Sequence, residues 1–231
     1  MVQENYKKVC EQINDTCEKC GRNPDDITLI AVSKTKPLSQ IEELIKIGVT
    51  EFGENYPQEL KEKSENVSVP VHFHQIGHLQ SNKVKYIIDK TSLIHSVDSI
   101  QLAKTIEKEC IKHEITADIL IEVNYAEEDS KFGVTKEETE PLIRRITSEC
   151  PHINICGLMT IAPFTEDPEN NRQIFHGMKQ LLLDIKYKKI DNVSMNVLSM
   201  GMTNDYKIAI EEGATMVRVG TAIFGARNYN K

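Results

Sequence analysis

Tryptophan is absent from this chain of 231 residues, and so is any long apolar run. A membrane-spanning helix needs about 20 consecutive apolar residues, so no span is expected. The N-terminus, Met-Val-Gln-Glu-Asn-Tyr, lacks the basic and apolar stretches of a secretory signal peptide. These absences predict a cytoplasmic protein without a membrane partner.

Long runs of lysine and arginine are also missing, and the net charge is −7. An acidic chain repels a phosphate backbone unless it carries a local basic patch. The lysines of residues 186–189 are typical of a solvated helix end. No nucleic-acid partner is therefore expected.

A second Cys-x-x-Cys pair is missing beside Cys17-x-x-Cys20, which by itself resembles half of a metal or redox site. The pair precedes Gly21, a residue that commonly ends helices. We therefore favour a helix end, and expect free thiols as in most cytoplasmic proteins. The cysteines are Cys10, Cys17, Cys20, Cys110, Cys150 and Cys156.

Short apolar, β-rich segments alternate with amphipathic segments along the whole chain. Strands are expected at residues 27–32, 49–52, 71–76, 93–97, 117–124, 153–158, 195–198 and 215–219. Alternation of this kind predicts a parallel sheet with helices outside, and eight units predict closure. The expected fold is a single α/β domain over residues 1–231, a TIM-type (β/α)8 barrel.

An open doubly wound sheet is the alternative, but no Gly-x-Gly-x-x-Gly follows the first strand. Helices are expected at residues 4–20, 39–47, 55–64, 82–88, 99–112, 135–149 and 203–212, with another opening at Asp167-Pro168. The first is an extra N-terminal helix. Capping boxes are expected at Ser39 with Glu42 and at Thr135 with Glu138.

Barrel active sites lie at the carboxyl ends of the strands, and phosphate often binds after the last two. Gly201 and Thr203 follow the seventh predicted strand, and Gly220 and Thr221 follow the eighth. Glycines let backbone N–H groups approach an anion, and the threonines add hydroxyl donors. Thr203 is also expected to begin a helix. Either loop alone is a weak signal, but together they indicate a phosphate site.

Lys34 directly follows the first apolar strand, at the expected barrel mouth. A partly desolvated amine there can form a Schiff base with an aldehyde, or the side chain can simply reach solvent. Lys36 is a nearby rival.

Arg218 interrupts an apolar strand, so its guanidinium needs an acceptor. Either a carboxylate such as Glu51 or Glu54, or a ligand atom such as a pyridine nitrogen, would serve.

His72, His74 and His78 lie close together in the sequence, without an acidic or cysteine partner at ligand spacing. No metal is expected. We expect His74 to be a hydrogen-bonding residue in the pocket.

Seven segments together resemble the pyridoxal phosphate homeostasis proteins, a family related to the barrel domain of alanine racemase. They are residues 31–35 (Ala-Val-Ser-Lys-Thr), 52–56 (Phe-Gly-Glu-Asn-Tyr), 74–83 (His-Gln-Ile-Gly-His-Leu-Gln-Ser-Asn-Lys), 95–98 (His-Ser-Val-Asp), 157–160 (Gly-Leu-Met-Thr), 198–205 (Leu-Ser-Met-Gly-Met-Thr-Asn-Asp) and 217–225 (Val-Arg-Val-Gly-Thr-Ala-Ile-Phe-Gly). They span nearly the whole chain in order.

The resemblance implies an alanine racemase-like barrel with pyridoxal 5′-phosphate (PLP) as cofactor, carried on Lys34 as an internal aldimine. It implies that Arg218 faces the pyridine nitrogen. The phosphate would be held by Ser199, Gly201, Thr203, Gly220 and Thr221, and the pocket lined by Asn55 and His74.

Three positions depart from the family pattern. Phe73-His74-Gln75 stands where Trp-His-Phe is usual, Pro57 follows Tyr56, and Thr203 replaces a commoner serine. The first two are expected to alter the pocket wall or the start of the next helix. The third keeps the hydroxyl.

The resemblance implies a carrier or buffer in vitamin B6 homeostasis, with PLP-dependent apoenzymes as recipients and a monomer or weak dimer as the state. The alternative is an amino-acid racemase, which needs a base on each face of Cα. In alanine racemase a C-terminal domain supplies the second base, and this chain ends at Lys231. A guanidinium at the pyridine nitrogen also weakens the electron sink. We therefore expect no catalytic residues.

Overall fold

Eight parallel strands close into a barrel in the computed structural model, which describes residues 1–128 and 131–226. They are β1 (Thr28–Val32), β2 (Glu51–Glu54), β3 (His72–Gln75), β4 (Leu93–Val97), β5 (Ala117–Glu122), β6 (Ile153–Met159), β7 (Val193–Met202) and β8 (Met216–Val219). β8 closes the ring by pairing with β1. The predicted (β/α)8 barrel is confirmed. The last residue, Lys231, lies outside the described residues.

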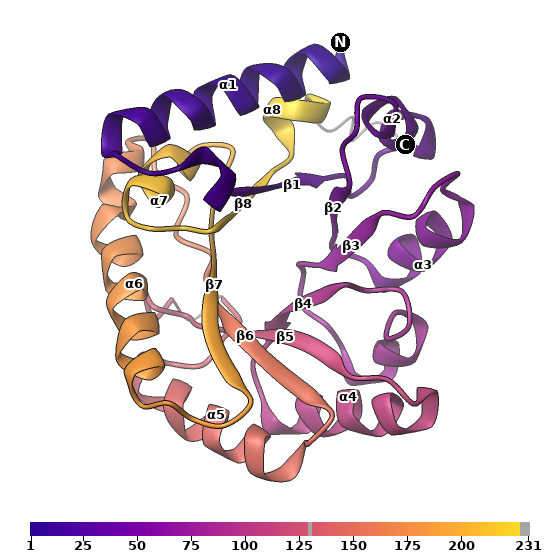
Figure 1. Ribbon diagram of the computed structural model, residues 1–231, viewed down its shortest axis with the longest axis vertical. Coiled ribbons are helices and arrows are strands. Elements are labelled where there is room, and N and C mark those ends of the chain that lie inside the picture. Colours follow the sequence, from indigo (N-terminus) through magenta and orange to yellow (C-terminus); the bar gives the residue numbers. More distant parts are fainter. Residues whose placement is uncertain (129–130, 227–231) are drawn as a thin grey trace.

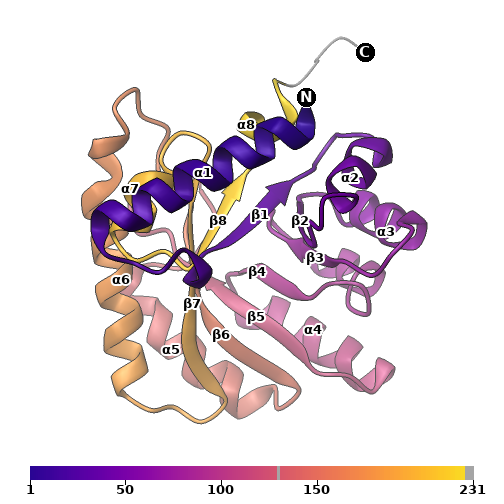
Figure 2. The same cartoon turned by 45° about the horizontal axis from the view of Figure 1, so that its top comes forward.

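Helices surround the strands (Figure 1). They are α1 (Val2–Cys20), α2 (Leu38–Ile45), α3 (Pro57–Asn66), α4 (Ile100–His113), α5 (Lys136–Glu149), α6 (Arg172–Tyr187), α7 (Tyr206–Glu211) and α8 (Thr221–Phe224), with 3-10 turns η1 (Pro24–Asp26), η2 (Ser81–Tyr86) and η3 (Pro168–Asn171). The extra helix α1 packs against α7 and α8, as Figure 2 shows. None of the described helices is both long and apolar enough to cross a membrane.

Three predicted helix ends are confirmed, two by a side-chain cap and one by a glycine. Thr135 and Glu138 form the expected capping box at the start of α5. Asp167 accepts a hydrogen bond from the Glu169 N–H and opens η3, which leads into α6. Gly21 ends α1 in the left-handed conformation, and the neighbouring Cys17 is buried.

Two predicted helix starts are wrong. The Ser39 capping box does not form, because Pro37 is the N-cap of α2 and Leu38 its first residue. Thr203 does not begin a helix, because β7 continues to Met202 and α7 starts only at Tyr206. The Asp205 side chain accepts from the Met202 N–H at 2.7 Å, and this contact closes the intervening turn.

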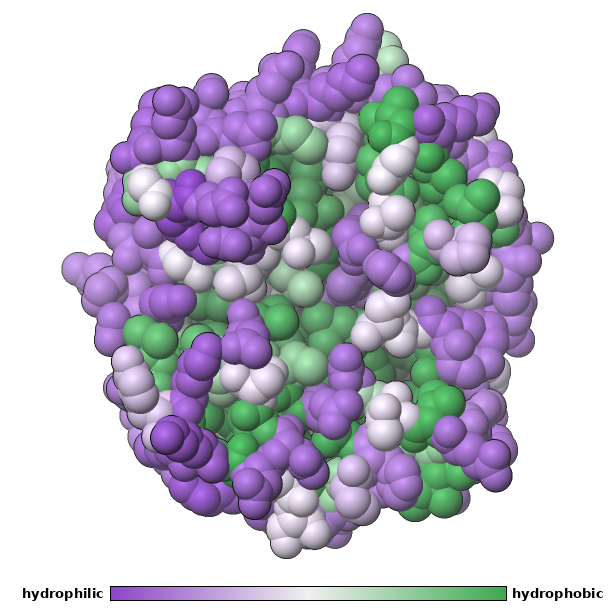
Figure 3. Space-filling model, in the orientation of Figure 1, coloured by the Kyte–Doolittle hydropathy of each residue, from purple (hydrophilic) through white to green (hydrophobic). Residues whose placement is uncertain are grey.

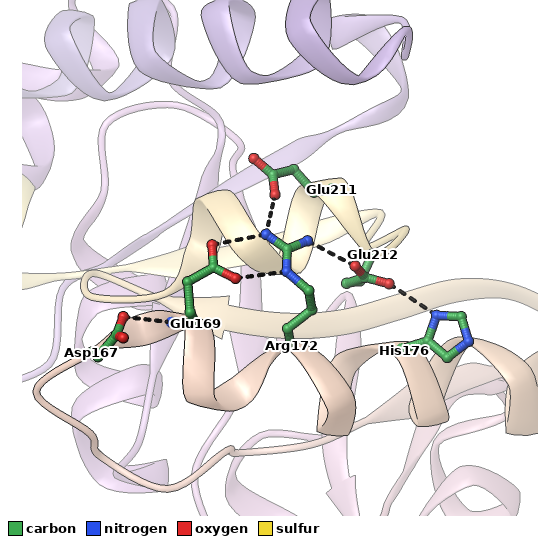
Figure 4. A network of polar contacts seen from close by, with 6 residues as sticks. All are labelled: Asp167, Glu169, Arg172, His176, Glu211 and Glu212. Atoms are coloured by element: carbon green, nitrogen blue, oxygen red, sulfur yellow. Dashed lines mark hydrogen bonds and ion pairs between the residues drawn. The ribbon is translucent and has the colours of Figure 1, made fainter.

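An arginine joins the start of α6 to the end of α7 (Figure 4). Arg172 makes a two-pronged ion pair with Glu169 and further bonds to Glu211 and Glu212. Glu212 also contacts His176. Because Arg172 bridges the start of α6 and the end of α7, it stabilises the position of the chain that follows β7.

The barrel interior differs from the shell between strands and helices. Side chains alternate along a strand, so Ile30 and Val32 point inward while their neighbours pack in the large outer core. A second inner cluster contains Leu93, Leu120 and Met159. On the face drawn in Figure 3, hydrophilic residues lie mostly at the periphery, and apolar residues are visible toward the centre.

Candidate functional site

A cavity of about 1010 Å³ opens among the loops at the carboxyl ends of the strands. This is where barrel enzymes and binding proteins place their sites. Of the residues predicted for the site, the cavity is lined by Lys34, Asn55, Thr203, Arg218, Gly220 and Thr221. It is large enough for a drug-sized ligand, which typically occupies roughly 300–1,000 Å³.

Lys34 lies half-buried in the cavity wall, directly after β1. Its neighbour Ser33 is fully buried and donates from Oγ to Oε1 of Glu54 at 2.6 Å. The ammonium of Lys63 donates to the Ser33 carbonyl and to the same Glu54 oxygen, both at 2.7 Å. The chain before Lys34 is therefore anchored by a buried ion pair.

The chain after Lys34 is held as well. Thr35 has a left-handed backbone, with φ of +62°, and its N–H donates to Oε1 of Glu59 at 2.7 Å. The same Glu59 oxygen accepts from Lys63 at 2.6 Å. A non-glycine residue at positive φ persists only where its surroundings hold it. Both flanks of Lys34 are thus attached to one charged cluster on β2 and α3.

Burial raises the pKa of Glu54 to about 7, although Lys63 and Ser33 both act to lower it. Lys63 is not among the residues predicted from the sequence. Its only signal was the spacing of four residues from Glu59, which places both side chains on one face of α3.

Lys36, the rival amine, points elsewhere. Its Nζ donates to the carbonyl oxygens of Phe224, Gly225 and Ala226 at 3.1, 3.2 and 3.3 Å. Lys36 therefore holds the end of α8 and does not line the cavity.

Arg218 forms part of the cavity wall and is only 3% exposed. It donates to Ser199 Oγ at 2.5 Å and to the Thr160 carbonyl at 2.8 Å. The expected carboxylate partners are not there, because Glu54 pairs with Lys63 and Glu51 binds two histidines.

Burial lowers the pKa of Arg218 to about 10, while Glu122 and Asp205 act to raise it. The guanidinium is therefore charged at neutral pH. At the cavity it can serve only as a hydrogen-bond donor.

Ser199 and Gly201 lie behind the cavity wall. Ser199 is fully buried, and its Oγ contacts Arg218 and His95. Gly201 has φ of +89°, and a Cβ there would lie 2.5 Å from the Cβ of Ala209. The close approach of α7 therefore requires this glycine. Thr203, Gly220 and Thr221 remain at the wall as hydroxyl and backbone donors.

His74 is inside the barrel and not in the cavity wall, contrary to expectation. Its Nδ1 lies 3.0 Å from His95 Nε2, and its Nε2 lies 2.7 Å from Glu51 Oε2. The alternation of side chains along the short strand β3 directs it inward. The cavity histidine is instead His78, whose ring stacks on Phe132 with centroids 3.7 Å apart.

Glu122 is a cavity residue that the sequence analysis missed. It ends β5 and is 4% exposed, and its Oε2 finds no hydrogen-bond partner among the described residues. Burial raises its pKa to about 7, with a further contribution from Asp98, while Arg218 opposes the shift. The signal for Glu122 in the sequence was an acidic residue at the end of an otherwise apolar strand.

The departures from the family pattern have local explanations. Phe73 is buried against Phe52 in the outer core and does not touch the cavity. Gln75 donates to the carbonyls of Asn55 and Gly77, so it ties together two loops at the mouth. Pro57 is the first residue of α3, a position that suits proline.

Residues 10–228 match the family model described as alanine racemase, N-terminal domain. Over 98% of both chains, the sequence is 42% identical to the pyridoxal phosphate homeostasis protein of Aquifex aeolicus. The chain belongs to the pyridoxal phosphate homeostasis protein family. The resemblance noted in the sequence is thereby confirmed.

Other relatives agree. The protein of that name from Escherichia coli K12 is 37% identical over 100% of this chain and 98% of its own. A structure from Bifidobacterium adolescentis superposes with a TM-score of 0.90 at 33% identity, covering 96% and 94% of the two chains. PipY of Synechococcus elongatus, solved with PLP bound, has a TM-score of 0.83 at 27% identity, covering 97% and 100%.

Alanine racemase of Clostridium difficile is more distant. It superposes with a TM-score of 0.75 at 15% identity, over 98% of this chain but only 58% of the racemase. This likeness shows the shared barrel fold.

Proposed function

We propose that this protein binds PLP in the cavity at the barrel mouth and holds it as a Schiff base on Lys34. The observation that carries the proposal is that Lys34 lines the same cavity as Arg218, Thr203 and Thr221. An amine, a charged donor and hydroxyl groups match the aldehyde, ring nitrogen and phosphate of PLP. The relative PipY was solved with PLP bound.

Each residue has a distinct role in this proposal. Arg218 donates a hydrogen bond to the pyridine nitrogen, and Thr203, Gly220 and Thr221 hold the phosphate. Asn55 lines the pocket, supported by the bond from Gln75 to its carbonyl. Ser199 and Gly201 lie behind the cavity wall and would not touch PLP. Ser199 holds Arg218, and Gly201 shapes the turn after β7.

We further propose that the protein is a carrier or buffer in PLP homeostasis, not an enzyme. PLP supplies an aldehyde that traps amines and a ring that accepts electrons. A protonated guanidinium leaves the ring nitrogen unprotonated, which weakens the ring as an electron sink. The curated relatives carry the name of homeostasis proteins. The recipients would be PLP-dependent apoenzymes in the cytoplasm, served by a monomeric or weakly dimeric one-domain protein.

The test is a visible absorption spectrum of the purified protein with added PLP, followed by borohydride reduction and peptide mass mapping. We expect a Schiff-base band in the wild type, loss of it in Lys34→Ala, and retention in the matched control Lys36→Ala. Equal spectra for wild type and Lys34→Ala would refute attachment at Lys34. Enzymatic interconversion of L- and D-amino acids that disappears in Lys34→Ala would favour a racemase.

A further inference from the structure

A chain of hydrogen bonds crosses the barrel interior from its amino-terminal end to the cavity. Arg218 Nη1 lies 2.5 Å from Ser199 Oγ, which lies 3.0 Å from His95 Nδ1. His95 Nε2 lies 3.0 Å from His74 Nδ1, and His74 Nε2 lies 2.7 Å from Glu51 Oε2. Glu51 is the first residue of β2, whereas Arg218 lines the cavity at the opposite end.

The two charged ends set the direction of every bond. Burial opposes ionisation of Glu51, but the hydrogen bonds from His74 and His72 outweigh it and lower the pKa to about 2. Glu51 can therefore only accept, so His74 carries its proton on Nε2. At the other end the guanidinium can only donate, so Ser199 Oγ accepts from it.

The proton positions in the middle of the hydrogen-bond path follow from those at its two ends. Burial lowers the pKa of His95 well below its ordinary value, with smaller effects from His74 and Arg218, so the ring is neutral. Its single proton lies on Nε2, because a proton on Nδ1 would point at a Ser199 oxygen that already accepts from Arg218 and would leave the serine proton without an acceptor. His95 therefore donates from Nε2 to Nδ1 of His74. His95 Nδ1 then accepts the proton of Ser199. Ser199, His95 and His74 then each accept one hydrogen bond and donate one, along a single path from Arg218 to Glu51.

The burial of these residues raises the free-energy cost of losing any hydrogen bond in the path. Ser199 and His95 are fully buried, and His74 is 3% exposed. The inward-facing neighbours include Ile30, Val32, Leu93 and Leu120, which offer no side-chain hydrogen bonds. A buried polar group that loses its partner costs about 1–3 kcal/mol. Water does not readily replace the partner in such an apolar setting.

We propose that Ser199, His95, His74 and Glu51 are positioning residues for Arg218, and that they connect the amino-terminal end of the barrel to the cofactor pocket. The hydrogen-bond chain holds the guanidinium in one orientation. A change at Glu51 alters PLP binding without touching PLP. The link to PLP affinity rests on the proposed function, whereas the hydrogen-bond path itself does not.

The path is tested first without PLP, by ¹⁵N NMR of the imidazole rings in the wild type at pH 7. We expect protonated Nε2 and unprotonated Nδ1 in both His74 and His95. Assignment uses His74→Gln and His95→Gln. A His95 ring that is protonated on Nδ1 would overturn the assigned direction, whether or not PLP binds.

The connection is tested by measuring the Kd of PLP in a double-mutant cycle. Glu51→Leu removes the final acceptor, and Ser199→Ala breaks the path next to Arg218. We expect Glu51→Leu to weaken binding on the order of tenfold in the wild-type background and less than about twofold in Ser199→Ala. The two residues do not touch, so such non-additivity requires the path between them.

The matched control is Glu107→Leu. Glu107 also binds a histidine, with 2.6 Å from Oε1 to His152 Nδ1, but lies outside the path. It should change PLP affinity by less than about twofold in both backgrounds. An equal effect of Glu51→Leu in both backgrounds, or none, would overturn the proposal. Failure of the wild type to bind PLP would instead refute the proposed function.

Discussion

The Nζ of Lys63 lies 2.7 Å from the carbonyl oxygen of Ser33, the residue immediately before Lys34. A buried ammonium on α3 therefore holds the backbone that presents Lys34, the residue that we propose forms the Schiff base. The same ammonium pairs with Glu54, whose side chain is fully buried. The position of Lys34 depends on this ion pair.

Lys63→Met should destabilise the protein and weaken PLP binding. Removal of one partner leaves Glu54 buried without its counter-ion, which typically costs about 3–5 kcal/mol. Lys61→Met is the control, because 44% of the Lys61 side chain is exposed and its pair with Glu65 at 3.9 Å is of a kind that contributes roughly 0–1 kcal/mol. The Lys61 Nζ also lies 5.9 Å from the centroid of the Tyr86 ring. Urea unfolding measures the free energy of unfolding of both variants. Similar losses for the two variants would contradict the anchoring role.

Glu122 should make stability depend on pH. Its pKa is raised in the folded state to about 7, so the folded protein holds a proton that the unfolded chain releases above its ordinary pKa of about 4.3. Its stabilising contribution is therefore present at low pH and lost as pH rises toward 7.

Glu122→Gln removes this titration, so the variant should gain stability relative to wild type between pH 5 and 8, by roughly 1–3 kcal/mol. Glu54 titrates in the same range but is common to both proteins. The control is Glu11→Gln on the exposed side of α1. Chemical unfolding at several pH values measures the stability of the wild type and of both variants. Parallel stability curves for wild type and Glu122→Gln would disprove the assignment.

Gly201→Ala should destabilise the protein more than Gly48→Ala. Both glycines have positive φ, +89° and +87°, but a Cβ at Gly48 has no neighbour within 4 Å. Gly48→Ala thus measures backbone strain alone, about 1–2 kcal/mol. Gly201→Ala adds the clash with Ala209 and displaces α7, so it should also reduce PLP affinity. Thermal unfolding and PLP titration compare the two, and equal losses would argue against the close approach of α7.

Thr221→Val should weaken binding of PLP but not of pyridoxal, which lacks the phosphate. A hydrogen bond to a charged group contributes about 1.5–3 kcal/mol, which corresponds to roughly tenfold to a hundredfold in Kd. Thr105→Val is the control, because Thr105 is a half-buried residue of α4 that does not line the cavity. Equal weakening of both ligands by Thr221→Val would place the phosphate elsewhere.

Local chemistry in the sequence was sufficient for much of the fold. The apolar segment 93–97 is β4 as predicted, and the Thr135 box opens α5 as predicted. Hydrophobic periodicity and capping act over a few residues, so they can be read without the rest of the chain. The alternation of strands and helices then determined the barrel and placed Lys34 at its mouth.

Only the tertiary structure decided which polar residues face the cavity. His74, Ser199 and Gly201 matched the family motif, yet they lie behind the wall, while Glu122 and His78 line it. Lys63 reads as a surface lysine in sequence, but the barrel buries it beside Glu54. Such pairings join residues from different strands and helices, and their geometry depends on strand register and barrel closure. Composition and spacing establish the elements and the chemistry available, and packing in three dimensions selects the partners.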